Sequence, residues 1–528
     1  MLVGLIFALG VVLRVVPFVQ DRALWIDEAV LADNIVRKSY AELGQPLDHH
    51  QAAALGFLWA QKWMVSTLGN GERALRVVPL VAGLLTMPVV FLLARRLCSA
   101  RGTLLSLLLV AVSDPLLYFG DEMKPYILDA FLATLVLWLA VRAVQRGHRW
   151  GDLVALAIAG GAASWLSLPI VFVLAGTMVS MMGHALLQRD RVAFIRLLLP
   201  AAVFVISFGA NFLLFIRFSA QSQVLQDYWQ TVGAFMPLPP RSVRDVLWFI
   251  ETLLNYFIDP GGFRSFGAVA LLAVLGGVML WRKCQVHLAL LVAPMFVTLA
   301  AAALKKYPFA TAGEMGEHWL GRVAVFSLPA VLVLVAMGLD GLARMAKRNG
   351  DPIIERTGHR REWALLAAAL LIMLIHPLER IARSVREAGN GQDVRVIFEH
   401  LAANQKPGDL VYPTWPVRQL ALYYRHRFPI GDPTTWISSH PILVKEMLSP
   451  DGWVRSNDWT QFENEMRAAA GRRLWLFISH ASFTSSQADE KFLKHLLSRR
   501  GTILDQRINA EASLYLVQLH AQPVLSER

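Results

Sequence analysis

The sequence predicts a polytopic α-helical membrane protein with about eleven transmembrane helices, followed by a C-terminal α/β domain outside the membrane. The 528 residues are 55% hydrophobic and only 17% charged, whereas soluble globular chains have about 25% charged residues. Many apolar runs approach the length of about 20 residues that a helix needs to cross the hydrocarbon. From about residue 385, short β-rich runs alternate with helix-like segments, which is typical of an α/β fold.

The predicted spans follow from the positions of the apolar runs. They cover residues 1–19, 76–94, 102–119, 126–144, 152–167, 169–187, 193–216, 265–281, 286–304, 321–343 and 362–378. The region 152–187 is divided at Leu168-Pro169 because the residue before a proline disfavours helical geometry. Residues 1–19 lack a basic n-region and a small-residue cleavage site, so we expect a retained span rather than a signal peptide.

Basic residues predict the orientation of these spans. Lys and Arg concentrate in alternate loops, namely 95–101, 142–149, 189–196, 282–283 and 344–361. The positive-inside rule places these loops and the N-terminus in the cytoplasm, and everything after residue 378 outside. The net charge of +12 follows from this topology, so we expect the bilayer as a partner and no nucleic acid.

The predicted domains are a transmembrane domain, residues 1–384, and an extracytoplasmic α/β domain, residues 385–528. The second domain alternates helix-like segments with strand-like runs and predicts a largely parallel sheet. The helix-like segments are 393–405, 459–471 and 487–498, and the strand-like runs are 409–412, 474–478 and 513–517. Three segments outside the membrane have the apolar spacing of amphipathic interfacial helices, namely 27–38, 51–68 and 241–258.

Two acidic pairs on the outer side are the candidate catalytic residues. Asp27 and Glu28 follow the first span, and Asp121 and Glu122 follow the third, with Lys124 close behind. Acids at this position can simply cap a helix or remain solvated. Two such pairs on one side, with a nearby cation, instead suit general-base chemistry beside an anionic lipid headgroup. We therefore expect the two pairs to face each other at one membrane surface.

Basic residues near the same surface are candidate phosphate ligands. Arg322 opens a span on the outer side, against the positive-inside trend, and a guanidinium can hold a phosphate through two hydrogen bonds. Lys306 precedes it, although lysines near span ends also extend to lipid headgroups. Asp129 lies inside a predicted span, where a charge is costly. It either pairs with a basic residue such as Arg14 or orients Lys124.

The first outer loop also contains the polar sequence His49-His50-Gln51. Adjacent histidines can bind a metal if Asp48 and His318 converge on them. The sequence offers no committed third ligand, so contact with substrate is the favoured interpretation. Only Cys98 and Cys284 are present, and no phosphate-binding glycine motif occurs. We expect no certain cofactor, with a divalent metal ion as the alternative.

These residues carry a resemblance to a known family. Trp25-Ile26-Asp27-Glu28-Ala29 resembles the first-loop acidic motif of the C-type (GT-C) membrane glycosyltransferases. The most similar group is family 39-like, with protein O-mannosyltransferases and lipid A aminoarabinose transferases, in particular its bacterial members. Further motifs that match in order are Gln51, Lys124-Pro125-Tyr126 with Asp129, Tyr307-Pro308-Phe309 followed by Arg322, and 407–412 with Tyr423-Tyr424.

The resemblance implies a polyprenyl-phosphate-linked sugar donor, a glycan, lipid or protein acceptor, and location in the bacterial inner membrane. It implies that Asp27 is the general base, that Asp121 or Glu122 assists positioning, and that the reaction inverts the anomeric configuration. Lys124 and Arg322 would neutralise the leaving phosphate. The remaining candidate substrate-binding residues are Glu28, Tyr126, Lys306, Tyr307, His50 and Gln51.

Two alternatives remain open from the sequence. About eleven spans also fit a polytopic transporter or lipid flippase, although such proteins place charges near the bilayer midplane and often contain repeats. A non-catalytic assembly or receptor protein would instead use residues 385–528 as its working part.

Overall fold

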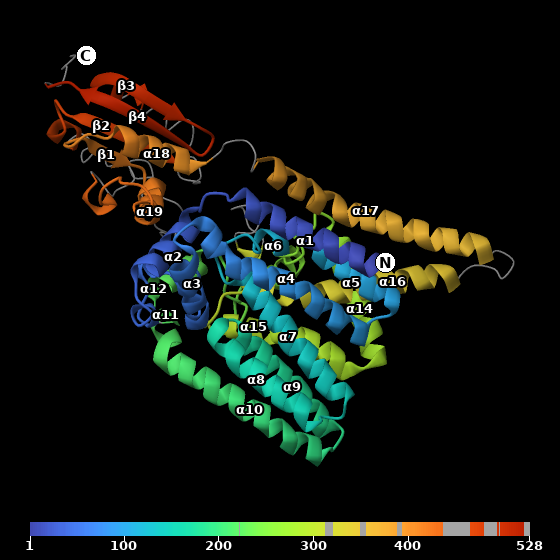
Figure 1. The fold of residues 1–528 in the computed structure, drawn as a ribbon. Helices are drawn as coiled ribbons and strands as arrows, with labels where there is room; N and C mark the ends of the chain where they lie inside the picture. Colours follow the sequence, from blue (N-terminus) through green and yellow to red (C-terminus); the bar gives the residue numbers. More distant parts are fainter. Residues whose placement is uncertain are drawn as a thin grey trace.

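The computed structural model describes residues 1–220, 222–311, 320–348, 355–387, 393–436, 465–479, 491, 494–495 and 497–521. A bundle of long helices forms the main body, and a small sheet with two helices lies at one end of it (Figure 1). Helix α1 (Leu2–Gln20) begins at the opposite end and runs toward the sheet. Asp27, which follows the C-terminus of α1 by seven residues, therefore lies at the end of the bundle next to the C-terminal elements.

Eight helical segments within the described residues are long and apolar enough to span a membrane. They are α1, α4 (Glu72–Leu97), α7 (Tyr126–Gln145), α9 (Ile170–Leu187), α10 (Arg191–Asn211) with its π-helical extension to Ile216, α14 (Phe266–Lys283), α15 (Gln285–Ala303), and η4 (Gly321–Ser327) with α16 (Leu328–Arg348). Helices α5 (Ala100–Ala111), α8 (Trp150–Leu166) and α17 (Glu355–Glu387) occupy the other predicted positions. Helices thus lie at every predicted span, but a count of eleven spans is not confirmed.

Prolines explain where the predicted helices divide. Helix α8 ends at Leu166 and α9 begins at Ile170, just after Pro169, as the sequence predicts. The predicted span 102–119 is wrong as a single helix, because α5 ends at Ala111 and a short helix α6 (Asp114–Tyr118) follows. Pro115 lacks the backbone N–H that a continuous helix would pair with the Ala111 carbonyl, which separates the two helices.

Helix α14 packs closely against α16, the helix that follows the segment with Arg322. A Cβ on Gly276 would lie 1.9 Å from the Leu334 carbonyl oxygen, and one on Gly338 would lie 2.0 Å from that of Leu272. Glycines at both positions let the two backbones approach, which is a common way to pack helices in membranes. The 3₁₀ helix η4 directly precedes α16, and its first residue, Gly321, donates its backbone N–H to the Asp259 carboxylate at 2.8 Å.

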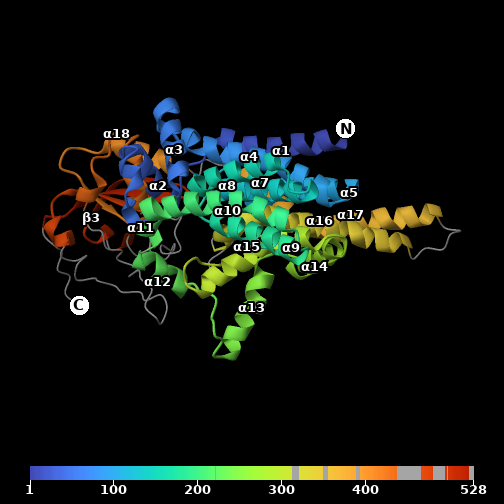
Figure 2. The same cartoon turned by 90° about the horizontal axis from the view of Figure 1, so that it is seen from below.

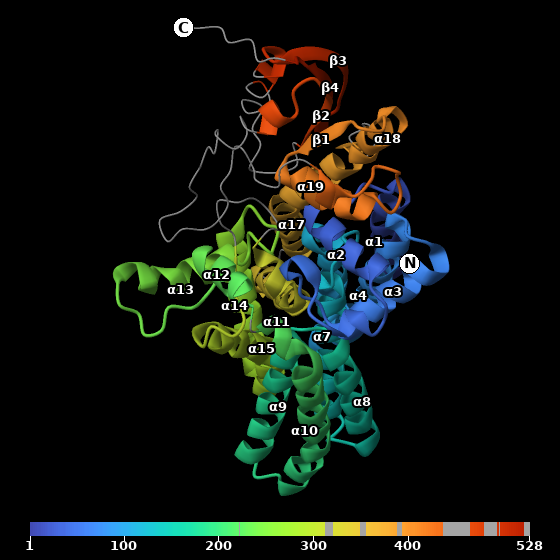
Figure 3. The same cartoon turned by 90° about the vertical axis from the view of Figure 1, so that its left-hand side faces the viewer.

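The helices outside the spans differ in burial. Helices α2 (Ile26–Arg37) and α3 (Leu55–Leu68) occur where the sequence predicts them. Helix α2 is buried from Glu28 to Ile35, however, because α19 (Trp415–Tyr424) covers it, so it is not an interfacial helix. Helix α3 exposes Trp59 and Trp63. Helix α13 (Val243–Asn255) exposes an apolar face and runs across the direction of the spans (Figures 2 and 3).

The C-terminal sheet has the strand order β1-β2-β4-β3. Its strands are β1 (Leu410–Pro413), β2 (Arg473–Ser479), β3 (Gly501–Ile508) and β4 (Ala512–Leu519). Only β1 and β2 are parallel, while β2–β4 and β4–β3 are antiparallel, so the predicted largely parallel sheet is wrong. Strand β3 was not predicted, because this edge strand carries polar side chains, including Asp505, instead of an apolar run. The Asn509 side-chain oxygen accepts hydrogen bonds from the backbone N–H groups of Glu511 and Ala512, which stabilises the β3–β4 hairpin.

Helix α18 (Val394–Asn404) confirms the predicted helical segment 393–405, whereas α19 was not predicted as a helix. The predicted helical segments 459–471 and 487–498 lie largely outside the described residues. Helices α18 and α19 lie between the sheet and the bundle, on the side of α2 (Figure 1). The C-terminal elements therefore contact the segment that carries the first acidic pair.

Candidate active site

Asp27 lies in the first turn of α2. The Glu28 carboxylate accepts the Trp25 backbone N–H at 3.2 Å and so stabilises the helix start. The two acids point into different surroundings, because the Asp27 side chain is 29% exposed and that of Glu28 is fully buried. Asp27 is thus the member of the pair that solvent or a substrate can reach.

Three distant parts of the chain converge on the Asp27 carboxylate. Its Oδ2 atom lies 3.5 Å from a guanidinium nitrogen of Arg322, in η4, and 3.9 Å from Nζ of Lys124, in the turn before α7. Burial alone would raise the pKa of Asp27, but Lys124 and Arg322 outweigh it and hold this pKa below its ordinary value. Lys124 also donates a hydrogen bond of 2.8 Å to the Gln51 side-chain oxygen. The cluster therefore combines one accessible carboxylate with two cations.

Glu28 is held entirely by the protein. Arg76 donates to both of its oxygens, at 3.2 and 3.1 Å, and the Met123 backbone N–H donates at 2.7 Å. Arg22 adds an ion pair at 3.7 Å. Burial acts to raise the pKa of Glu28, but Arg76, Arg22 and these backbone donors lower it below its ordinary value. Glu28 therefore has the surroundings of a structural anchor.

The second acidic pair packs beside the first. Arg22 binds Asp121 through a side-chain contact of 2.9 Å and a backbone contact of 2.9 Å. The Trp25 indole donates to Oε1 of Glu122 at 3.0 Å. Burial and the nearby Glu28 carboxylate raise the pKa of Glu122 to about 7. The structure thus brings the two predicted acidic pairs together.

The aromatic candidates support the cluster from the side of the bundle. The Tyr307 hydroxyl donates to the Val323 carbonyl at 3.1 Å, directly after Arg322, which links its loop to η4. The Tyr126 ring packs edge-on against Phe119, with centroids 5.1 Å apart. The Arg322 guanidinium lies 5.7 Å from the ring centre of Trp229, close enough for a cation–π contact.

Arg14 does not pair with Asp129, so the structure does not support the first of the two alternatives for Asp129. Arg14 instead donates to the backbone carbonyls of Gly10, Val110 and Ala111 at 3.0 to 3.3 Å. Backbone carbonyls at the end of α5, near the break before Pro115, provide acceptors that satisfy this buried guanidinium locally. Asp129 is buried on α7, one turn after Lys124.

Two predicted site residues lie apart from the cluster. The side chains of Lys306 and His50 are exposed, and among the described residues neither contacts Asp27, Lys124 or Arg322. Within the described part of the chain, no group of three or more His, Cys, Asp or Glu side chains could hold a metal ion. Asp48 pairs with Arg37 and Lys38, while His318 lies outside the described residues.

Sequence reasoning missed the residues that organise the acids, namely Arg22, Trp25 and Arg76. Arg76 carries the same signal that singled out Arg322, since it opens a predicted span on the outer side. Arg22 directly precedes the acidic motif, where its charge could have suggested a bridge between the two pairs. The indole of Trp25 gave no comparable signal.

Known proteins are similar to this chain in part of its sequence and in its fold. Residues 52–210, which include Asp121, Glu122 and Lys124, match the family described as dolichyl-phosphate-mannose-protein mannosyltransferase. No curated protein matches the chain by sequence. ArnT from Cupriavidus metallidurans, solved bound to undecaprenyl phosphate, has the same fold, with a TM-score of 0.51 at 16% identity over 97% of this chain and 98% of that chain.

The chain is therefore similar in fold to ArnT, and its residues 52–210 are similar in sequence to the mannosyltransferase family. The archaeal oligosaccharyltransferase AglB from Archaeoglobus fulgidus, in complex with an inhibitory peptide and a dolichol-phosphate, is also similar. Its TM-score is 0.52 at 12% identity, over 97% of this chain and 73% of that chain. The predicted fold class is confirmed, and the matches to transferases do not favour the transporter or flippase alternative.

Proposed function

We propose that this chain transfers a sugar from a polyprenyl-phosphate-linked donor to a hydroxyl group of an acceptor. The observation that carries the proposal is the convergence of Lys124 and Arg322 on the Asp27 carboxylate, at 3.9 and 3.5 Å. Two cations beside a carboxylate can bind a phosphate and leave the carboxylate free to take a proton. The positive-inside pattern supports a site on the outer face of a bacterial inner membrane, with a cytoplasmic N-terminus.

In the proposed reaction, Asp27 removes the proton from the acceptor hydroxyl. The acceptor oxygen attacks the anomeric carbon from the side opposite the phosphate, so a new glycosidic bond forms and the bond to the phosphate oxygen breaks. Polyprenyl phosphate leaves with the bonding electron pair, and the configuration is inverted. Lys124 and Arg322 stabilise the negative charge that grows on the leaving phosphate.

The cations also connect donor binding to the strength of the base. Before the donor binds, Lys124 and Arg322 hold the pKa of Asp27 low, which makes its carboxylate a weak base. A bound phosphate competes for both cations, so the pKa of Asp27 rises toward the range of an effective proton acceptor. Asp27 would thus become a better base only when a donor is present.

The comparisons support the class of donor. The ArnT structure contains bound undecaprenyl phosphate, and the AglB structure is a complex with a dolichol-phosphate. Both ligands combine a polyprenyl chain with a phosphate, the chemistry that Lys124 and Arg322 fit. We propose a glycan, lipid or protein as the acceptor, and no step in this scheme requires a metal ion.

The test is a donor-consumption assay on the full chain in lipid nanodiscs. A panel of undecaprenyl-phosphate sugars is offered with membrane-extracted acceptors, and released undecaprenyl phosphate is measured by mass spectrometry. We expect Asp27→Asn to lower turnover by about 10²–10⁴-fold, the usual contribution of a general base. Asp505→Asn, which removes a carboxylate paired with His400 in the C-terminal sheet, is the control and should retain activity. Unchanged turnover in Asp27→Asn would contradict the proposal.

A further inference from the structure

The segment between α1 and α2 leads directly to Asp27 but has no regular secondary structure. Residues 22–25 belong to neither helix, and Asp21 has a left-handed conformation with φ of 54°. Leu24 is 2% exposed, so its backbone groups have little access to water. A buried backbone N–H or C=O needs a protein partner. The partners of residues 21–25, called here the lead segment, therefore decide where α2 begins.

The bundle holds two carbonyl groups of the lead segment. Arg76 of α4 donates to the carbonyl oxygen of Arg22 and, at 3.2 Å, to that of Ala23. The same guanidinium binds Glu28. These contacts tie the lead segment to the transmembrane helices from one side.

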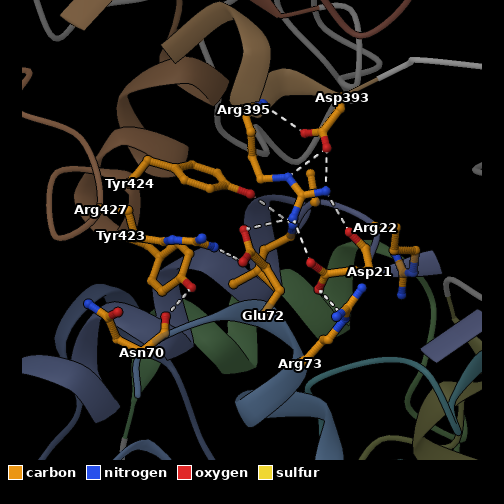
Figure 4. Close-up of polar contacts among 12 residues, drawn as sticks. Asp21, Arg22, Asn70, Glu72, Arg73, Asp393, Arg395, Tyr423, Tyr424 and Arg427 are labelled. Atoms are coloured by element: carbon orange, nitrogen blue, oxygen red, sulfur yellow. Dashed lines mark hydrogen bonds and ion pairs between the residues drawn. The ribbon is translucent and has the colours of Figure 1, made fainter. Parts of the chain in front are cut away.

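The C-terminal elements hold the other side. The Leu24 backbone N–H donates to the hydroxyl oxygen of Tyr424, in α19, at 3.0 Å. Arg395, in α18, donates to the carbonyl oxygen of Asp21 and lies 3.3 Å from its carboxylate. Figure 4 shows Tyr424 and Arg395 reaching from the C-terminal elements toward Asp21 and Glu72. Leu24 is three positions before Asp27, so the Tyr424 contact acts close to the proposed base.

A ring of charges keeps Arg395 in place. The Nε atom of Arg395 donates to the Asp393 carboxylate at 2.6 Å, and another guanidinium nitrogen of Arg395 lies 3.6 Å from the carboxylate of the buried Glu72. Arg427 also pairs with Glu72 (Figure 4). Glu72 thus pairs with two cations, and Arg395 pairs with the carboxylates of Asp21, Glu72 and Asp393, which favours one fixed arrangement.

A second group of contacts docks the same elements without touching the lead segment. The Tyr423 hydroxyl donates to the Asn70 carbonyl at 2.6 Å, and the Asn70 side chain donates to the His426 carbonyl at 3.2 Å. His426 also contacts Asp33 of α2 at 2.9 Å. Tyr423 and Tyr424 are therefore adjacent, equally buried tyrosines; the Tyr424 hydroxyl binds the lead segment at Leu24, whereas the Tyr423 hydroxyl binds Asn70.

We propose that Tyr424 is a positioning residue, through which the C-terminal α/β elements fix the lead segment and thereby the Asp27 carboxylate. The catalytic part of this inference rests on the proposed function, whereas the structural part does not. Loss of the Tyr424 hydroxyl leaves the Leu24 N–H without its acceptor. The lead segment then moves more freely, and Asp27 spends less time within reach of Lys124 and Arg322.

The structural part is tested by hydrogen–deuterium exchange on the full chain in nanodiscs, without any substrate. We expect the peptide that contains residues 21–28 to exchange about tenfold faster in Tyr424→Phe than in wild type, because a buried hydrogen bond is lost. Tyr423→Phe is the matched control and should leave this peptide unchanged. Equal exchange in both variants would overturn the proposal. If Tyr424→Phe does not fold, Arg395→Gln should give the same increase, and its absence would be equally decisive.

The catalytic part is tested with the donor-consumption assay. We expect Tyr424→Phe to lower kcat by about ten- to a hundredfold, in line with the effect of small misplacements, while KM for the donor stays within about twofold. Faster exchange at residues 21–28 with wild-type kcat would overturn the positioning role. Wild-type protein without any transfer activity would contradict the proposed function, and the exchange result would still decide the structural part.

Discussion

The buried ion pair between Arg76 and Glu28 allows a direct test of how the first acidic pair is built. The two side chains are 1% and 0% exposed, and one guanidinium nitrogen contacts both carboxylate oxygens at 3.2 and 3.1 Å. Arg76→Met would leave Glu28 as a buried carboxylate without its main cation, and would also free the carbonyl groups of Arg22 and Ala23. Breaking a buried pair in this way typically costs about 3–5 kcal/mol.

The corresponding thermal shift can be estimated from the chain length. Unfolding entropy near 2.1 cal/mol/K for each of 528 residues amounts to about 1.1 kcal/mol/K. A loss of about 3–5 kcal/mol therefore lowers Tm by roughly 3–5 °C. Arg73→Met on the same helix is the control, because Arg73 is 57% exposed and its ion pair with Asp21 is 3.7 Å long. An exposed pair contributes about 0–1 kcal/mol, so the control should shift Tm by about 1 °C or less.

A double-mutant cycle separates the pair from its surroundings. Glu28→Gln and Arg76→Met each remove one charge, and the double variant removes both, so it leaves no unpaired charge behind. We expect the double variant to be about 2–3 kcal/mol more stable than the sum of the single effects predicts. Unfolding is followed by intrinsic tryptophan fluorescence in detergent micelles. Additive effects, or an Arg76→Met shift no larger than that of Arg73→Met, would refute the anchoring role of Glu28.

Two further predictions concern Glu122 and the backbone before Arg322. The folded-state pKa of Glu122 is raised to about 7, so the stability that Glu122 contributes is fully present below about pH 4.5 and is lost as the pH rises through about 7. The loss amounts to about 3 kcal/mol in total. Glu122→Gln should therefore flatten the pH dependence of Tm between pH 5 and 8, and an unchanged slope would contradict this. A Cβ on Gly321 would lie 2.3 Å from the Asp259 carboxylate. Gly321→Ala should therefore lower the free energy of unfolding by about 1–3 kcal/mol through overpacking. Gly267 has open space around it, so Gly267→Ala is the control and should not change Tm measurably in the same thermal assay.

Several parts of the candidate site could be predicted from local sequence. The lengths of the apolar runs and the distribution of basic residues predict that Asp27, Lys124 and Arg322 lie on the same side of the membrane. Their convergence within 4 Å joins three parts of the chain that local patterns treat separately. The sequence left open whether Arg14 pairs with Asp129 for the same reason, because the carbonyl groups at the end of α5 that bind Arg14 come near it only after the helices pack.

The amino-acid sequence by itself determined the helical architecture, because the thickness of the hydrocarbon sets the length of each apolar run and prolines interrupt the helices locally. It also determined that Asp27-Glu28 and Asp121-Glu122 each follow an apolar run. Only the tertiary structure decided that Asp27 is accessible and Glu28 is locked, since the Met123 N–H that binds Glu28 lies 95 positions further along the chain. The contact between Tyr424 and Leu24 spans 400 positions. Such contacts depend on how whole elements pack, so the sequence motifs around Leu24 and Tyr424 do not show that these two residues meet.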